Sequence, residues 1–239
     1  MNYKKISMDE YDIHLIKNKN FHTIDCRVFF AENVSKELIT YRNALVDVLT
    51  YATKNYDTKE KLIKKCQDLY SLKPTAINVR NGNLLVTKCG ISIIDSSYVP
   101  ENTLLENIKL LKEIILNPLI DSNGFSKKYF DITKKNLELE TKTIDEEPRL
   151  YASIKLLKLL DEKERIVSGY SDLTILNEMT PKSLYESYLD LIKNSKIDIF
   201  ISGNIKDEDK IIEMIEDNFT FQNEFSKLNE PSIVHDIKK

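Results

Sequence analysis

The sequence has few of the residues on which many binding motifs depend. It contains no tryptophan, five glycines, three histidines and three cysteines in 239 residues. It forms neither a P-loop nor a G-x-G-x-x-G dinucleotide motif, and it has no G-x-S-x-G nucleophile elbow. Cys26, Cys66 and Cys89 are odd in number and far apart, which argues against a disulfide framework and a zinc ribbon. We therefore expect no cofactor.

Long hydrophobic runs are also missing. No apolar stretch approaches the roughly 20 residues that span a bilayer, and residues 1–11 are polar where a signal peptide needs an apolar segment. We therefore expect a cytoplasmic protein with no membrane partner. The 35 basic and 38 acidic residues are interspersed and give a net charge of -3, so no basic surface for nucleic acid is expected.

Alternating polar and apolar residues predict strands in the first part of the chain. The alternation over residues 23–30 is typical of a strand with one buried face, and we expect residues 10–31 to form a hairpin that turns near 17–20. Asn81-Gly82 predicts a second hairpin with a type I′ turn, because both central residues of that turn need positive φ. With residues 84–94 as the return strand, four antiparallel strands are predicted before residue 96.

Helical periodicity and capping residues predict the other elements. Ser35 and Thr58 stand at N-cap positions before amphipathic stretches that run to about residues 52 and 71. Further helices are expected at residues 100–117, 126–145, 148–160, 181–193 and 207–219, with a strand at 197–201. This order predicts an α+β fold, a two-layer sandwich in which helices cover one face of a mainly antiparallel sheet.

Several short motifs follow one another in an order that resembles a known family. Ser168-Gly169-Tyr170 precedes the helix motif Met179-Thr180-Pro181-Lys182-Ser183-Leu184 and the strand end Ile201-Ser202-Gly203-Asn204. Earlier in the chain come Ala52-Thr53, Asn117-Pro118 and Glu146-Glu147-Pro148. Together they resemble the N-terminal half of insulinase/pitrilysin-type metallopeptidases, the inverzincins. The resemblance implies the LuxS/mitochondrial processing peptidase-like metallohydrolase fold.

In that family the zinc motif H-x-x-E-H lies on the first long helix. The two histidines are four residues apart and share one helical face, so both can bind one ion while the glutamate polarises the bound water. Aligning Ala52-Thr53 with the family's glycine and threonine places Asn43, Val46 and Asp47 at the three motif positions. The chain's histidines are His14, His22 and His235, none of them on this helix. The resemblance thus implies a degenerate motif and no metal site.

Two remaining groups of residues could in principle bind a metal. Glu140 matches the family's third zinc ligand when the alignment is anchored at Pro148, and with Asp47 it could bind a hard cation weakly. Two carboxylates fall short of the six or so oxygens that calcium prefers. His22 and Cys26 would share a strand face, yet a lone pair lacks the four ligands of a structural zinc site. We expect Glu140 to be a solvated helix residue and Cys26 a buried thiol.

The resemblance implies a pseudo-peptidase. We expect residues 1–221 to form an insulinase-like N-terminal domain and residues 222–239 to lead to a second homologous half. The main hypothesis is a non-catalytic subunit or domain that supports an active zinc peptidase partner, as in peptidase-like proteins associated with bacterial elongation factor P modification. One alternative is a stand-alone module that binds an extended peptide by strand addition. Another is a zinc metalloendopeptidase, supported by the family name only.

Overall fold

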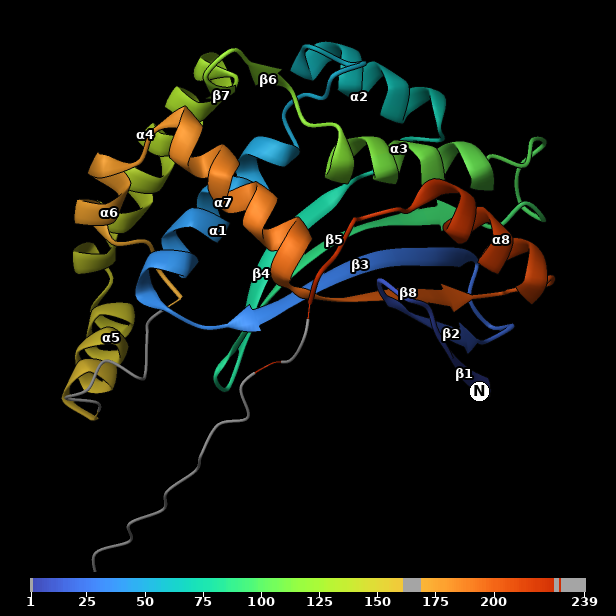
Figure 1. The fold of residues 1–239 in the computed structure, drawn as a ribbon, viewed down its shortest axis with the longest axis horizontal. Helices are drawn as coiled ribbons and strands as arrows, with labels where there is room; N and C mark the ends of the chain where they lie inside the picture. Colours follow the sequence, from blue (N-terminus) through green and yellow to red (C-terminus); the bar gives the residue numbers. More distant parts are fainter. Residues whose placement is uncertain (1, 161–168, 226–227, 229–239) are drawn as a thin grey trace, which may run out of the picture.

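The computed structural model describes residues 2–160, 169–225 and 228. These residues form a sheet with helices along one side of it (Figure 1). Six strands run across the sheet in the order β1-β2-β8-β3-β5-β4. They are β1 (Asn2–Ser7), β2 (Asp12–Lys17), β3 (Thr23–Asn33), β4 (Thr75–Asn81), β5 (Leu84–Ile94) and β8 (Lys196–Gly203), and a separate two-stranded hairpin consists of β6 (Ile120–Asp121) and β7 (Gly124–Phe125).

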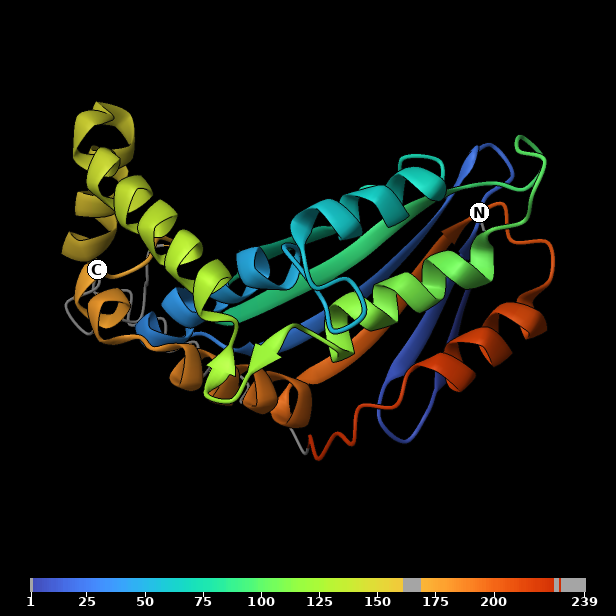
Figure 2. The same cartoon turned by 90° about the horizontal axis from the view of Figure 1, so that it is seen from above.

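The helices form a layer over the sheet, which is clearest when the molecule is seen from above (Figure 2). In the same views α4, α5 and α6 gather beyond one end of the sheet. None of the described helices is long and apolar enough to cross a bilayer. The helices are α1 (Lys36–Leu49), α2 (Lys59–Asp68), α3 (Leu104–Leu116), α4 (Lys127–Thr143), α5 (Pro148–Leu160), α6 (Leu173–Glu178), α7 (Pro181–Asn194) and α8 (Glu208–Asn218), with a 3-10 turn at Ile144–Glu146.

The hydrophobic core lies between the two layers. On β8 the side chains of Ile197, Ile199 and Ile201 are at most 2% exposed, whereas Asp198 and Phe200 on the opposite face are partly exposed. Strict alternation of this kind is expected when one face of a strand packs on helices and the other does not. The predicted α+β two-layer architecture, with a mainly antiparallel sheet, is therefore confirmed.

The predicted hairpin over residues 10–31 is wrong. β8 lies between β2 and β3, parallel to β2 and antiparallel to β3, with Ile199 paired to both Ile13 and Val28. The segment between β2 and β3 contains no glycine that would favour a tight hairpin turn. The two strands can therefore lie apart, with β8 between them. β1, which the sequence analysis missed, pairs with β2 at the sheet edge and is almost entirely exposed, so it has little hydrophobic pattern.

The second hairpin is present, but its turn differs from the prediction. Asn81 is the last residue of β4 and pairs with Leu84, which leaves Gly82 and Asn83 as the two loop residues. Gly82 has a φ of 61°, while Asn83 is not among the residues with positive φ. A glycine with positive φ at the first central position alone is the pattern of a type II′ turn, not type I′.

Capping residues set the ends of several helices as the sequence indicates. Ser35 and Thr58 accept hydrogen bonds at the starts of α1 and α2, and Thr180 forms a capping box ahead of Pro181. Beyond α8, contacts with the domain run past the predicted boundary at residue 222. Asn223 donates to the carbonyl oxygens of Ile192 and Ser195 near the end of α7. Residues 229–239 of the predicted linker lie outside the described residues.

A buried ion pair joins the sheet to α1. Arg42 is fully buried, and its guanidinium donates to both carboxylate oxygens of Glu32 on β3 at 2.7 Å. A third nitrogen donates to the hydroxyl and the carbonyl oxygen of Ser187 on α7 at 2.7 and 2.9 Å. Because the charge is paired and its donors are hydrogen bonded, its burial is tolerated, but loss of the carboxylate would leave an uncompensated cation.

We expect Glu32→Gln to lower the free energy of unfolding by about 3 kcal/mol, because Arg42 keeps its charge in a dry site. Urea denaturation of the two proteins measures the difference. The control is Asp131→Asn, which breaks an ion pair with Lys127 whose side chains are 54% and 77% exposed, and which should change stability by less than about 0.5 kcal/mol. Equal effects of the two substitutions would contradict this role of Glu32.

Candidate functional site between α1 and α4

The exposed side of α1 carries the positions at which the sequence analysis places the degenerate motif. Asn43 and Asp47 are four residues apart and share one helical face, with Val46 beside them, and all three are half-buried. The opposite side of the helix, which includes Ala44, Leu45 and Val48, is buried in the core. The core contacts of α1 therefore fix the direction in which the motif positions point.

Asn43 acts as a structural amide. Its Nδ2 donates to the carbonyl oxygen of Gly169 at 3.1 Å and to the hydroxyl of Ser171 at 3.2 Å. Its Oδ1 accepts from Nδ2 of Asn78 on β4 at 3.0 Å, and Asn78 in turn accepts from Thr87. The side chain thus links α1 to the segment before α6 and to the edge of the sheet. Both ends of the amide are used, so Asn43 has little freedom to serve as a ligand.

Asp47 on α1 lies close enough to Glu140 on α4 for the two charges to interact. α1 packs against α4, and burial together with the charge of Glu140 raises the pKa of Asp47 above the ordinary aspartate value of 3.8. Tyr51, which follows the end of α1, accepts a long hydrogen bond of 3.5 Å from Asn136 on α4, and burial and the charge of Asp47 raise its pKa. Among the described residues, this acidic patch consists of two carboxylates, an amide and a phenol and includes no imidazole.

The two histidines that the structure describes lie away from α1 and α4. His14 is on β2, whereas His235 lies outside the described residues. His22 precedes β3, is exposed, and packs edge-to-face on Tyr98 at 4.6 Å. Cys26 is 1% exposed in the core, and burial raises the pKa of its thiol to about 12. The expectation that His22 and Cys26 share a strand face is therefore wrong, since His22 stands before the strand begins, whereas the expectation of a buried thiol is confirmed.

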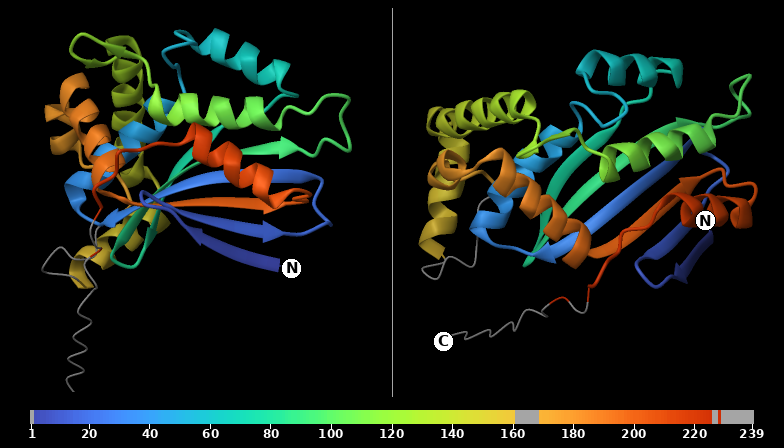
Figure 3. Two further views of the ribbon diagram at one scale, coloured as in Figure 1. Left: turned by 45° about the vertical axis from the view of Figure 1, so that its right-hand side comes forward. Right: turned by 45° about the horizontal axis from the view of Figure 1, so that its top comes forward.

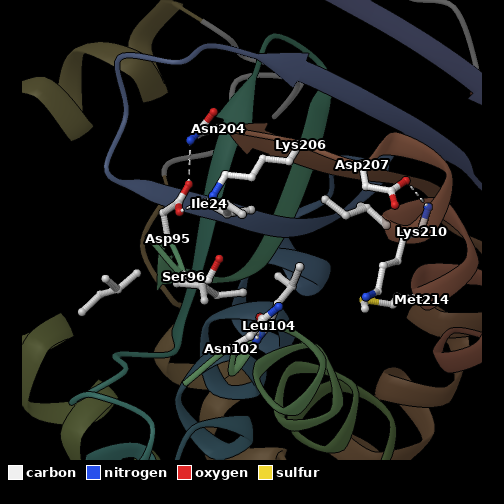
Figure 4. A pocket seen from close by; sticks show the side chains of 13 residues that line it. Ile24, Asp95, Ser96, Asn102, Leu104, Asn204, Lys206, Asp207, Lys210 and Met214 are labelled. Atoms are coloured by element: carbon white, nitrogen blue, oxygen red, sulfur yellow. Dashed lines mark hydrogen bonds and ion pairs between the residues drawn. The ribbon is translucent and has the colours of Figure 1, made fainter. Parts of the chain in front are cut away.

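A separate hollow of about 190 Å³ lies where α3 and α8 begin beside the ends of β3 and β5. Figure 4 shows Asp95, Asn204 and Lys206 meeting on its wall. The Asp95 side chain is 1% exposed and accepts hydrogen bonds from Asn204 at 2.9 Å and from the backbone and hydroxyl of Ser97 at 2.7 Å. The carboxylate of Asp95, just after β5, therefore links the end of β5 to Asn204, just after β8. We assign no chemical role to the hollow.

The sequence analysis missed a further group of possible metal-binding side chains. Asp12, His14 and Asp198 lie together on the sheet face away from the helices. The even-numbered positions 12 and 14 place two of them on one face of β2. The third is brought by β8, a pairing that the sequence pattern does not show.

No protein-family model matches the chain. A curated relative, described as the probable inactive metalloprotease YmfF of Bacillus subtilis (strain 168), is 23% identical in an alignment 223 residues long. The match covers 86% of this chain and 52% of the relative. The chain therefore spans about half the length of the curated relative that it matches.

Solved structures match over nearly the whole chain. A conserved protein from Enterococcus faecalis V583 aligns with a TM-score of 0.90 and 23% identity over 96% of this chain and 55% of that protein. A peptidase M16 inactive domain from Pseudomonas fluorescens aligns with a TM-score of 0.74 and 12% identity over 97% of this chain and 54% of that one. The chain thus has the fold of one half of a peptidase M16 protein of the insulinase/pitrilysin type, and the predicted resemblance to an inactive member of that family is confirmed.

Proposed function

We propose that the chain is a non-catalytic insulinase-type half that forms one wall of a peptide-holding chamber with a second homologous half or an active partner chain. The fold of a peptidase M16 domain and the half-length match support this proposal. The observation that carries it is the α1–α4 site, in which two helices pack together and hold an acidic pair, with no imidazole among the residues that the structure describes. Such a site cannot hold catalytic zinc in the H-x-x-E-H manner.

The proposal includes a residue-by-residue reading of the site. Asn43, Val46 and Asp47 stand for the histidine, glutamate and histidine of the motif, and Glu140 for the third ligand. The charge of Glu140 acts on Asp47, which supports this reading because the third ligand must reach the motif. We also propose that residues 1–221 form an insulinase-like N-terminal domain, that residues 222–239 lead to a second homologous half, and that the protein is cytoplasmic.

A pull-down with the tagged chain from its native cells tests the partner. We expect an H-x-x-E-H-containing protein at equal stoichiometry, and peptide hydrolysis by the pair but not by the isolated chain. Zinc-dependent hydrolysis by the isolated chain would overturn the proposal. Failure to recover any such partner, even when the cells are crosslinked before the pull-down, would also overturn it.

Peptide binding without an enzymatic partner is the second candidate, and the free edge of β4 supports it. Among the described strands, β4 pairs with β5 only, at the end of the sheet, and Ile77 on it is 50% exposed. Asn78 on this strand is hydrogen bonded to Asn43, so a peptide added here would run past the degenerate motif. Backbone groups on an unpaired edge can bind an extended peptide as one more strand.

Ala76→Pro tests the strand-addition mode. In the two-residue hairpin Asn81 and Leu84 exchange hydrogen bonds, so the alternation of the ladder directs the N–H of Ala76 away from β5. We expect proline there to weaken binding of an extended peptide about tenfold, measured by fluorescence anisotropy, since it removes a donor on the free edge. Ala76→Ser keeps the N–H and should bind normally. Equal affinities would exclude addition at β4.

Restoring the motif tests the residue assignment. The triple variant Asn43→His, Val46→Glu, Asp47→His should bind one more zinc ion per chain than the unsubstituted protein, measured by metal analysis after dialysis, because it recreates three ligands with Glu140. Adding Glu140→Gln to the triple variant should weaken this zinc about tenfold or more. A triple variant that folds, by circular dichroism, but gains no zinc would refute the assignment.

Asp47 also makes a pH-dependent contribution to stability. Its raised pKa means that the folded chain holds this proton more tightly than the unfolded chain, so stability falls as pH rises from the ordinary value of 3.8 through the raised one. We expect Asp47→Asn to raise the free energy of unfolding at pH 7 by about 0.5 kcal/mol, the scale of one like-charge contact. Glu138→Gln, elsewhere on α4, is the control. A loss of stability at pH 7 in Asp47→Asn would contradict this account.

A further inference from the structure

The sheet face away from the helices carries a polar group of its own, formed by Asp12, His14 and Asp198. These residues belong to β2 and β8, the two strands next to the edge strand β1 (Figure 3). Asp12 and His14 lie two residues apart on β2, and Asp198 of β8 stands directly beside Asp12 in the parallel register. Their ligand atoms lie within 4.8 Å of one another, and Nε2 of His14 is 2.9 Å from an oxygen of Asp198. Two hydrogen-bonded strands therefore hold the three side chains in a nearly fixed arrangement.

His14 is oriented as a ligand would be. Its ring stacks on Phe200 with centroids 4.3 Å apart and planes 10° apart, and the residue is only 8% exposed. The hydroxyl of Tyr3 on β1 lies 2.8 Å from Nδ1. When Tyr3 accepts a hydrogen bond from Nδ1–H, the lone pair of Nε2 points toward the carboxylates. Histidines that bind metals commonly have their other ring nitrogen fixed in this way.

Two lysines currently balance the carboxylates. Lys5 lies 2.9 Å from Asp12, and Lys196 lies 2.9 Å from both oxygens of Asp198 and 3.8 Å from Asp12. Burial raises the pKa of Asp12, but hydrogen bonds from Lys5 and Ser7 outweigh it and hold the pKa below its ordinary value. One divalent ion carries the same charge as the two ammonium groups, so it could replace them while both flexible side chains turn to water.

We propose that Asp12, His14 and Asp198 form a binding site for a divalent transition metal, with Zn²⁺ as the ion of choice. One imidazole and two carboxylates suit zinc and its first-row neighbours better than calcium or magnesium, which prefer oxygen ligands alone. The site lies on the opposite face of the sheet from α1 and uses none of the α1–α4 residues. The test of this zinc site is therefore independent of the test of the proposed function.

Zinc titration of the whole chain, followed by competition with a chromophoric chelator, tests the site. We expect one zinc ion per chain, with binding weakened at least tenfold in His14→Gln and in Asp198→Asn because each removes a ligand. Tyr3→Phe should weaken binding about tenfold by releasing the ring. Lys196→Met should strengthen it, because it removes the competing cation. The controls Glu140→Gln and His22→Gln should bind as the unsubstituted chain does.

NMR of the imidazole nitrogens in the unsubstituted protein keeps the test independent of variants that fail to fold. Zinc should shift the signals of His14 and leave those of His22 in place. No zinc binding, binding that survives both His14→Gln and Asp198→Asn, or signals of His14 that do not respond to zinc would each overturn the proposal.

Discussion

The insertion of β8 between β2 and β3 is the constraint on which the rest of the structure depends. Residues 196–203 pair with segments that lie about 180 residues earlier in the chain, and they bring Ile197, Ile199 and Ile201 into the centre of the core. Without this strand, β1 and β2 would not be hydrogen bonded to β3, β5 and β4 through the sheet. Such distant pairings are formed against a large loop-closure entropy, so the sheet and its helix layer are expected to fold together rather than in parts.

The alternation of β8 also separates the molecule into two chemically different sides. On the helix side, the isoleucines of β8 are buried in the core, and the buried pair of Arg42 and Glu32 ties α1 to β3. On the other side, the same strand places Asp198 beside His14. On the helix side, the described residues around Asp47 and Glu140 include no imidazole, whereas on the open side His14 lies beside two carboxylates.

Local patterns in the sequence were sufficient for much of the fold but for only part of the sites. The caps at Ser35, Thr58 and Thr180 and the hairpin around Gly82 depend on neighbouring residues, so the sequence indicates them correctly even where the turn type differs. The place of β8 and the exposed edge strand β1 depend on distant partners, and periodicity contains no information about those. For the same reason Asp47 and Glu140 could be paired only through the family resemblance, and the group at His14 was missed.

Loss of the zinc motif is physically compatible with an intact fold. A catalytic zinc ion is held by three protein ligands at the surface of a domain whose core is already complete, unlike a structural zinc ion that supplies the folding energy itself. In this chain the core side of α1 is fully packed, and Asn43 forms three hydrogen bonds. The amide thus anchors α1 to β4 and to the segment before α6, so protein groups alone hold this part of α1 in place. Burial and the charge of Glu140 both disfavour the ionised form of Asp47, which makes this carboxylate the unfavourable element of the arrangement.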